Sequence, residues 1–171
     1  VAQETTVYGI DLYKKKMLPE LLHRLCAIPG IVWIRLLYCY PEEITPELVQ
    51  VMKEEKKICH YLDLPIQHAS DKILRRMGRR TSKQQLIDII TKLRHEIPDI
   101  VLRTSLITGF PGETEEDHQE LMEFVDEIEF DRLGVFTYSP EEGTPAETME
   151  GQVPEEVKEA RRDEIMELQQ E

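Results

Sequence analysis

One stretch of the sequence, residues 100–114, combines a strand-like run with residue types that bind ligands. Residues 100–107 are apolar except for Arg103 and the two hydroxyl residues after it, and several of them are β-branched, a pattern typical of a strand covered on both faces. A charge in such a strand needs a partner or a cavity, because a buried unpaired charge is costly. Gly109 and Gly112 permit a tight turn and a close approach of the backbone to a ligand. The stretch predicts either a ligand loop or a plain tight connection from strand to helix.

Polar or aromatic side chains also stand where other predicted strands end. They are Gln3, Glu4, Gln67, Phe136 and Tyr138. In a parallel barrel the carboxyl ends of the strands meet at one mouth, where ligands bind. A carboxylate, a guanidinium and an aromatic ring together suit a zwitterionic ligand with a flat heteroaromatic part. On this hypothesis Arg103 binds the ligand carboxylate and Glu4 its ammonium. The ring of Tyr138 or Phe136 then lies near the heteroaromatic group.

Each of these residues also has a purely structural explanation. Gln67 can tie its own loop to backbone groups, and Tyr138 can pack in the core. His68 is expected to be a structural hydrogen-bonding residue rather than a metal ligand, because no second ligand stands at a suitable spacing. Asp63 can cap a helix or pair with Arg35. No catalytic residue stands out, since the sequence shows no Ser-His-Asp order, phosphate loop or paired catalytic carboxylates.

The elements that must position these residues alternate between strands and helices. Strands are predicted over residues 1–6, 31–38, 60–65, 100–107 and 133–138. Helices are predicted over 18–27, after an N-cap at Thr45, after a Thr81–Gln84 capping pair, after an N-cap at Thr114, and after Pro154. Residues 8–11 are predicted to form a loop. The alternation predicts an α/β fold, a partial parallel (β/α) barrel that lacks its first βα unit.

Composition narrows the classes of partner. The chain has 171 residues and a net charge of -13, so it repels phosphate backbones and is not expected to bind nucleic acid directly. A basic protein suits this charge, although a merely solvated surface is the alternative. The basic residues at 75–80 are an exception, and they are interpreted either as a solvated helix face or as a contact for a phosphate or an acidic patch. No run approaches the roughly 20 apolar residues that a membrane span needs.

The cysteines and the first residue bear on location and completeness. Cys26, Cys39 and Cys59 are scattered and odd in number, which favours a reducing compartment and a cytoplasmic protein. Their spacing matches no short metal-binding motif, so no metal ligand is predicted. The chain opens on Val1 in what the pattern predicts to be mid-strand, and we therefore expect a piece of a longer protein.

Five segments together resemble the radical S-adenosylmethionine methylthiotransferases. They are VAQETTVYGIDLY at 1–13, LPIQHAS at 64–70, RRMGRR at 75–80, RTSLITGFPGET at 103–114 and FTYSPEEGTPA at 136–146. The resemblance is closest to the branch that modifies an aspartate of a small-subunit ribosomal protein. The branch that modifies a tRNA adenosine looks like Gln-Asn at the first strand end and Ser-Gly at the place of His68 and Ala69. In this sequence those places read Gln3-Glu4 and His68-Ala69, which is similar to the ribosomal branch. The ribosomal branch more usually has Asp at the place of Glu4.

The resemblance implies a six-stranded partial barrel in which S-adenosylmethionine lies across the strand ends and chelates a 4Fe-4S cluster. It implies that Gln3 and Glu4 meet the methionine part of the cofactor, that Gln67 lies near the ribose, and that Arg103 pairs with the carboxylate. The segment 107–113, which includes Gly109, and the strand end at 136–139, which includes Phe136 and Tyr138, would border the adenine. The chain would then hold strands two to six and the following helix as one core, residues 1–171.

The family's Cys-Xaa3-Cys-Xaa2-Cys cluster loop does not occur in this sequence. The resemblance also implies an N-terminal domain and a C-terminal TRAM-type domain that residues 1–171 do not include. We therefore predict that the chain alone holds no cluster and is inactive. The implied partners are a basic ribosomal protein as substrate and an electron donor such as flavodoxin or ferredoxin. The alternatives are a tRNA-modifying enzyme of the same family and a non-catalytic acidic module that binds a basic protein.

Overall fold

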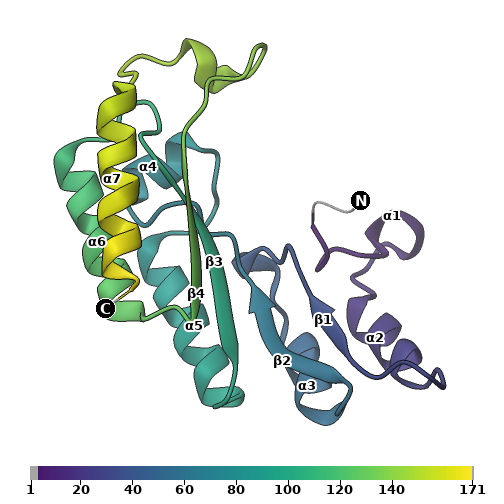
Figure 1. Ribbon diagram of the computed structural model, residues 1–171. Coiled ribbons are helices and arrows are strands. Elements are labelled where there is room, and N and C mark those ends of the chain that lie inside the picture. The colour runs from purple at the N-terminus through teal and green to yellow at the C-terminus, as the bar shows by residue number, and fades with distance from the viewer. Residues whose placement is uncertain (1–3, 171) are drawn as a thin grey trace. The chain divides into compact units, whose positions relative to one another are not determined.

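The computed structural model describes residues 4–170 as four strands and a series of helices (Figure 1). The strands are β1 Ile34–Leu36, β2 Ile58–Asp63, β3 Val101–Thr108 and β4 Arg132–Thr137. The α-helices are α1 Ile10–Tyr13, α2 Leu18–Cys26, α3 Pro46–Glu54, α4 Asp71–Arg76, α5 Lys83–Glu96, α6 Glu115–Ile128 and α7 Glu155–Leu168. Two 3-10 helices are η1 Pro41–Glu43 and η2 Pro145–Thr148.

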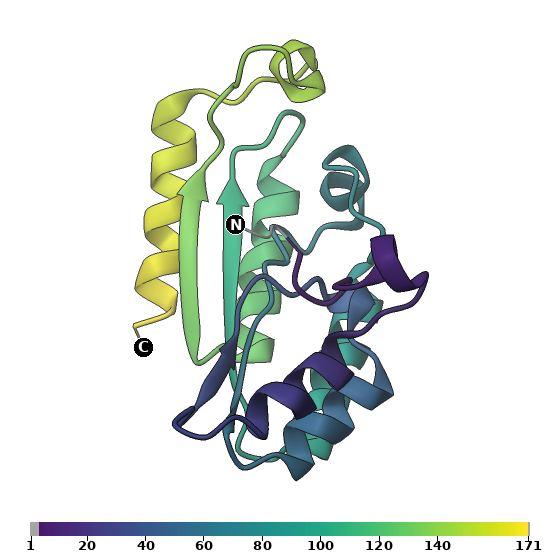
Figure 2. The ribbon, with the colours of Figure 1, turned by 90° about the vertical axis from the view of Figure 1, so that its right-hand side faces the viewer.

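The strands form one sheet in the order β1-β2-β3-β4. The pairings of β1 with β2 and of β2 with β3 are parallel, and Figure 2 shows β3 and β4 running in the same direction. The predicted α/β class with a parallel sheet is therefore confirmed. Along β3 burial alternates, with Leu102, Thr104 and Leu106 fully buried while Arg103 and Ser105 on the other face are partly exposed. The prediction of a strand covered on both faces was wrong, because the residues on the Arg103 face are only partly buried.

The chain divides into two compact units, which are described separately. The first unit comprises the described residues up to Pro65 together with 88–103, and the second comprises 66–87 together with 104–170. In the first unit, α2 and α3 lie side by side (Figure 2). Helix α3 begins as the sequence predicts, because the Thr45 side chain accepts a hydrogen bond from Leu48 N at 3.2 Å and Pro46 takes the first helical position.

In the second unit, α6 and α7 pack against each other and α7 packs on β4 (Figure 1). Helix α6 begins with a capping box in which Thr114 and Asp117 each accept the other's backbone N–H, as the sequence predicts. Its buried stripe includes Leu121, Phe124 and Val125. This stripe anchors the helix that follows the turn at residues 109–113, called the glycine turn below, and so fixes where that turn lies.

Three local predictions were wrong. Residues 4–6 form no strand, because the chain turns at once and Tyr8 N donates to Thr5 O at 3.2 Å; residues 1–3 lie outside the described part. Residues 8–11 were predicted to form a loop, but residues 10 and 11 belong to α1, which continues to Tyr13. The capping pair of α5 is Ser82 with Gln85, whose side chains each accept the other's backbone N–H at 3.3 and 2.9 Å. The predicted pair, Thr81 with Gln84, was therefore shifted by one residue.

Among the described residues, the helices are too short or too polar to span a membrane.

Candidate functional site

Arg103 in the first unit forms an ion pair with Asp63. Arg103 Nη1 donates to Asp63 Oδ1 at 2.6 Å, with side-chain exposures of 36% and 4%. The two residues are register partners on β3 and β2, so their side chains leave the same face of the sheet. Asp63 was predicted to cap a helix or to pair with Arg35, but it accepts from Arg103 and from Tyr38 N, and Arg35 lies 5.1 Å from the centre of the Tyr61 ring. Strand register, which the sequence alone does not give, brings Arg103 and Asp63 together.

A hydrogen-bonded series continues from Asp63 to Glu4. Asp63 Oδ2 accepts from Tyr38 N at 3.2 Å, and Tyr38 adopts a left-handed backbone with φ 57°. Two residues on, Tyr40 N donates to Glu4 Oε2 at 2.9 Å. The other Glu4 oxygen accepts from the backbone N–H of Thr6 at 2.8 Å and from the Thr6 hydroxyl. The first unit therefore links two predicted ligand residues, Glu4 and Arg103, through the segment that follows β1.

Cys39 lies in that same segment and is fully buried. Burial, reinforced by the negative charges of Glu4 and Asp63, raises the pKa of the Cys39 thiol to about 12. A thiol held protonated is a poor metal ligand and a poor nucleophile. Among the described residues no group of three or more His, Cys, Asp or Glu side chains is placed to hold a metal ion.

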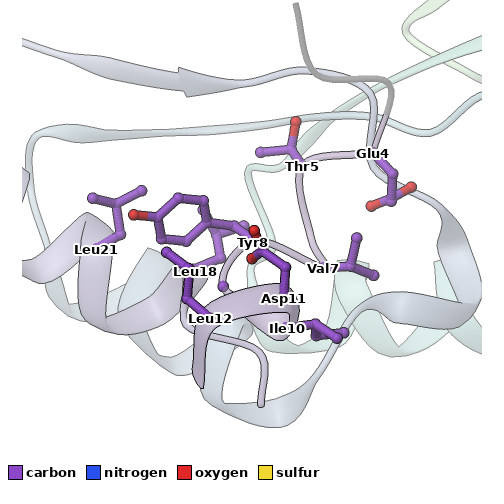
Figure 3. Close-up of a pocket in the computed structure, with 10 residues that line it drawn as sticks. Glu4, Thr5, Val7, Tyr8, Ile10, Asp11, Leu12, Leu18 and Leu21 are labelled. Carbon is purple, nitrogen blue, oxygen red and sulfur yellow. The ribbon is translucent and has the colours of Figure 1, made fainter. Parts of the chain in front are cut away.

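A cavity of about 550 Å³ borders Glu4 in the first unit (Figure 3). Its lining is mostly apolar and includes Tyr8 and Leu12 from the α1 region together with Leu18 and Leu21 of α2. In Figure 3 Glu4 lies at one end of the group and Leu21 at the other. The cavity therefore offers an apolar wall beside a carboxylate, although none of the other predicted ligand residues that the structure describes lines it.

Gln67 in the second unit is fixed to β3 by its backbone. Gln67 N donates to Ser105 O at 3.0 Å, and Gln67 O accepts from Ile107 N at 2.8 Å. The residue adopts a left-handed backbone with φ 71°, which is uncommon for a side chain of this size. These bonds hold the loop after β2 against the strand that leads into the glycine turn.

His68 is fully buried, and its surroundings fix its tautomer. His68 Nδ1 accepts from Ser70 N at 2.9 Å, so the ring proton must be on Nε2, since a backbone N–H can only donate. Nε2 faces the carboxylate of Glu113, with 3.3 Å between Nε2 and Oε2. The structural interpretation of His68 therefore accounts for Nδ1 by a hydrogen bond, whereas Nε2 lies near Glu113 without a hydrogen-bond partner among the described residues.

The turn from Gly109 to Glu113 is closed by a carboxylate inside it. Glu113 Oε2 accepts from Gly109 N at 2.9 Å, and Oε1 pairs with Arg161 Nη1 of α7 at 2.9 Å. Burial acts to raise the pKa of Glu113, but His68, the Gly109 N–H and Arg161 outweigh it, and the net pKa is lowered. Glu113 is therefore an ionised group that is fully enclosed, and its donors define the shape of the turn.

The two aromatic residues at the end of β4 lie in different environments. The Tyr138 ring is packed edge-on against Phe110 at 5.2 Å between centroids, in a small apolar cluster with Ile73. Its hydroxyl is buried and has no hydrogen-bond partner among the described residues. Phe136 is 58% exposed. An unpartnered buried hydroxyl costs free energy, and a bound polar group would remove that cost.

Arg76, one of the basic residues at 75–80, is partly buried and bonds to backbone carbonyl groups, so it is not part of a fully solvated helix face. Arg76 Nε donates to Pro111 O at 2.8 Å, and Nη2 donates to Glu150 O at 3.0 Å. A Cβ added to Gly112 would lie 2.9 Å from Arg76 Nε, so the turn needs glycine there. Arg75 and Arg80 are exposed. Arg76 therefore braces the glycine turn against the loop that follows η2.

Three residues that organise the turn were not predicted to do so from the sequence: Glu113, Lys158 and Arg161. Glu113 stands next to Gly112 and could have been singled out. Lys158 and Arg161 gave no signal, because they lie in a strongly charged helix of the kind that is usually solvated. Gln3, a predicted ligand residue, lies outside the described residues.

The chain is similar to known proteins over nearly its whole length. It is 70% identical over 170 residues to the ribosomal protein uS12 methylthiotransferase RimO of Lachnoclostridium phytofermentans and 61% identical over 170 residues to RimO of Clostridium botulinum, strain Langeland. These alignments cover 99% of this chain but 39% and 38% of the relatives, so the chain spans about two fifths of their length.

Solved structures share the fold at low identity. Streptococcus suis SuiB bound to the precursor peptide SuiA matches with a TM-score of 0.54 and 17% identity, over 88% of this chain and 32% of that one. The cobalamin-dependent S-adenosylmethionine radical enzyme OxsB matches with a TM-score of 0.50 and 13% identity, over 91% of this chain and 21% of that one. The sequence model of the Radical SAM superfamily matches residues 3–125, and the chain belongs to that superfamily.

Proposed function

We propose that the chain is the core of a radical S-adenosylmethionine methylthiotransferase that modifies ribosomal protein uS12, with an aspartate side chain as the target. The observation that carries this proposal is the 70% identity to RimO across 99% of the chain. The net charge of -13 supports a basic protein as substrate. The three free cysteines agree with a cytoplasmic location.

The first unit supports binding of the amino-acid part of S-adenosylmethionine. The Arg103 side chain is 36% exposed and its guanidinium is oriented by Asp63, so its exposed part can also bind a carboxylate. The Glu4 carboxylate is fixed by backbone donors of Thr6 and Tyr40, and can accept further hydrogen bonds from an ammonium group. Gln3 is proposed as its neighbour in this role.

The second unit supports binding of the nucleoside part. Gly109 lets the backbone approach a ligand closely, and Gln67 lies in a loop that is tied to the same strand. The unpartnered Tyr138 hydroxyl offers one donor and one acceptor beside the Phe110 ring, and Phe136 offers an exposed ring. These residue types fit adenosine, which is flat and carries polar edges.

The described residues do not fit a 4Fe-4S cluster. No metal-holding group is present among them, and Cys39 is kept protonated by burial. In an intact enzyme of this superfamily the cluster supplies the electron that starts radical chemistry on S-adenosylmethionine, with flavodoxin or ferredoxin as the proposed reductant. We propose that residues 1–171 alone are inactive, and that they bind and orient the organic cofactor.

The test uses the full-length protein, reconstituted with iron and sulfide, together with S-adenosylmethionine, reduced flavodoxin and uS12. Mass spectrometry should detect a methylthio group on one aspartate of uS12. Arg103→Ala should weaken S-adenosylmethionine binding at least about tenfold, because it removes a charge-assisted contact. Arg24→Ala, at an exposed ion pair of α2, serves as the control.

Two outcomes would contradict the proposal. Modification of a tRNA adenosine, with uS12 left unmodified, would assign the chain to the tRNA-modifying branch. Unchanged cofactor affinity and turnover in the Arg103 variant would favour a non-catalytic acidic module. A separate reconstitution of residues 1–171 tests the proposed inactivity, and a stable stoichiometric cluster absorbance on that chain would contradict it.

A further inference from the structure

Helix α7 carries two cations that are almost fully buried. The side chains of Lys158 and Arg161 are 5% and 8% exposed, whereas that of the neighbouring Arg162 is 37% exposed. Residues three apart lie on the same face of a helix, so both buried cations point inward. Burying a charge is costly unless it is paired and hydrogen-bonded. Their partners therefore show what this face of α7 is built to hold.

Arg161 holds the carboxylate that closes the glycine turn. Its Nη1 pairs with Glu113 Oε1 at 2.9 Å, and its Nη2 pairs with Glu115 Oε2 at 3.2 Å at the start of α6. The same Glu113 accepts from Gly109 N through its other oxygen. Arg161 therefore fixes the group that in turn fixes the backbone of Gly109.

Lys158 holds the other side of the same turn. Lys158 Nζ donates to Tyr138 O at 2.8 Å, where β4 ends, and lies 5.3 Å from the centre of the Tyr138 ring. Its stem lies against the turn, since a Cβ added to Gly109 would be 2.1 Å from Lys158 Cγ. The Thr108 hydroxyl donates to Lys158 O at 3.0 Å. Lys158 therefore connects the ends of β3 and β4 to α7.

Resting on the proposed function, we propose that Lys158 and Arg161 are positioning residues that hold the Gly109–Glu113 turn and Tyr138 in the conformation that binds S-adenosylmethionine. Gly109 and Gly112 both have positive φ, and an unrestrained glycine turn can adopt many conformations. Fixing the turn before the ligand arrives lowers the entropy cost of binding. Helix α7 thus contributes to cofactor affinity without its side chains needing to touch the cofactor.

The experiment compares the full-length, reconstituted wild type with Lys158→Met, Arg161→Met and the matched control Arg162→Met. Equilibrium dialysis with labelled S-adenosylmethionine gives both the dissociation constant and the number of sites per chain. We expect each buried substitution to raise the dissociation constant at least about tenfold, and the control to stay within about twofold. A merely structural role would lower the number of sites by unfolding part of the sample and leave the dissociation constant of the remaining sites unchanged.

The outcomes separate this inference from the proposed function. If the wild type does not bind S-adenosylmethionine, the proposed function fails. If the wild type binds and the Lys158 and Arg161 variants keep its dissociation constant, this inference is overturned and the proposed function stands. If Arg161→Met does not fold, Arg161→Lys replaces it in the experiment. Lysine keeps the charge, but its single nitrogen cannot pair with Glu113 and Glu115 as the two guanidinium nitrogens do. An unchanged dissociation constant in Arg161→Lys would then overturn the inference, and a raised one supports it.

Discussion

Asp63 and Arg103 are register partners on neighbouring parallel strands, and their side chains meet at 2.6 Å between Oδ1 and Nη1. The carboxylate is 4% exposed and the guanidinium 36% exposed. Asp63, the more buried residue of the two, therefore depends more on the ion pair to offset the cost of its burial than Arg103 does. Asp63 also accepts from Tyr38 N, so the same carboxylate restrains the segment after β1.

Asp63→Asn should destabilise the chain by about 2 kcal/mol, because it removes a buried charge-assisted contact while leaving the shape unchanged. Urea unfolding followed by circular dichroism measures the change in the free energy of unfolding. Asp163→Asn is the matched control, since Asp163 pairs with Arg162 on the surface and its side chain is 62% exposed. The control should change stability by less than about 0.5 kcal/mol. Equal losses in the two variants would contradict the importance assigned to the buried pair.

Gly109 and Gly143 offer a second matched comparison. Both have positive φ, 74° and 80°, so alanine is strained at either position. A Cβ at Gly109 would meet Lys158 Cγ at 2.1 Å, whereas a Cβ at Gly143 has nothing within 4 Å. Gly143→Ala should cost about 1 kcal/mol from backbone strain alone. Gly109→Ala should cost at least about 2 kcal/mol more, because the Lys158 stem must move as well.

Thermal unfolding of the two glycine variants beside the parent chain gives the comparison. If the two variants lose the same stability, Lys158 does not pack closely against Gly109. The positioning role of Lys158 would then lose one of its supports.

The sequence predicted the parallel α/β fold and that the charge of Arg103 needs a partner, since both follow from local pattern and electrostatics. It could not name Asp63 as that partner, because register between β2 and β3 depends on the packing of the whole sheet. The caps show the same limit. Thr81 with Gln84 and Ser82 with Gln85 both fit the capping pattern in the sequence, whereas in the structure α5 starts at Lys83, which makes Ser82 the N-cap.

The buried face of α7 was beyond sequence reasoning for a different reason. Its charged residues outnumber its apolar ones, so periodicity marks no inward face. Lys158 and Arg161 are buried because Tyr138 and Glu113, distant in sequence, lie opposite them. Such pairing is a property of the assembled structure, and sequence spacing does not encode it.

Cys39 should be the least reactive of the cysteines in the folded chain. Burial, with the charges of Glu4 and Asp63, raises the pKa of its thiol to about 12, so almost no thiolate exists at pH 8. Cys59 is only partly buried. Brief treatment with iodoacetamide at pH 8 should label Cys59 in the folded protein and label Cys39 only after unfolding in urea. Peptide mass spectrometry reads the sites, and labelling of both at similar rates would contradict this prediction.

Asp117 should make stability depend on pH in the acid range. Burial acts to raise its pKa, but Lys72, the Thr114 N–H and the Ser70 hydroxyl outweigh that effect and lower the pKa from 3.8 to about 2. A lowered folded-state pKa stabilises the protein above the unfolded-state value, and the stabilisation is lost as pH falls through the folded-state value. The shift corresponds to about 2 kcal/mol, present above about pH 4 and lost toward about pH 2.

Asp117→Asn should therefore lower the free energy of unfolding by about 2 kcal/mol at pH 7, and the difference from the parent chain should shrink as pH falls from about 4 to about 2. Urea unfolding at several pH values measures the difference directly. Asp126→Asn, at an exposed carboxylate of the same helix, is the matched control and should show little difference at any pH. If the difference in the free energy of unfolding between Asp117→Asn and the parent chain stays constant down to pH 2, the lost stability comes from the cap geometry and not from the charge of Asp117.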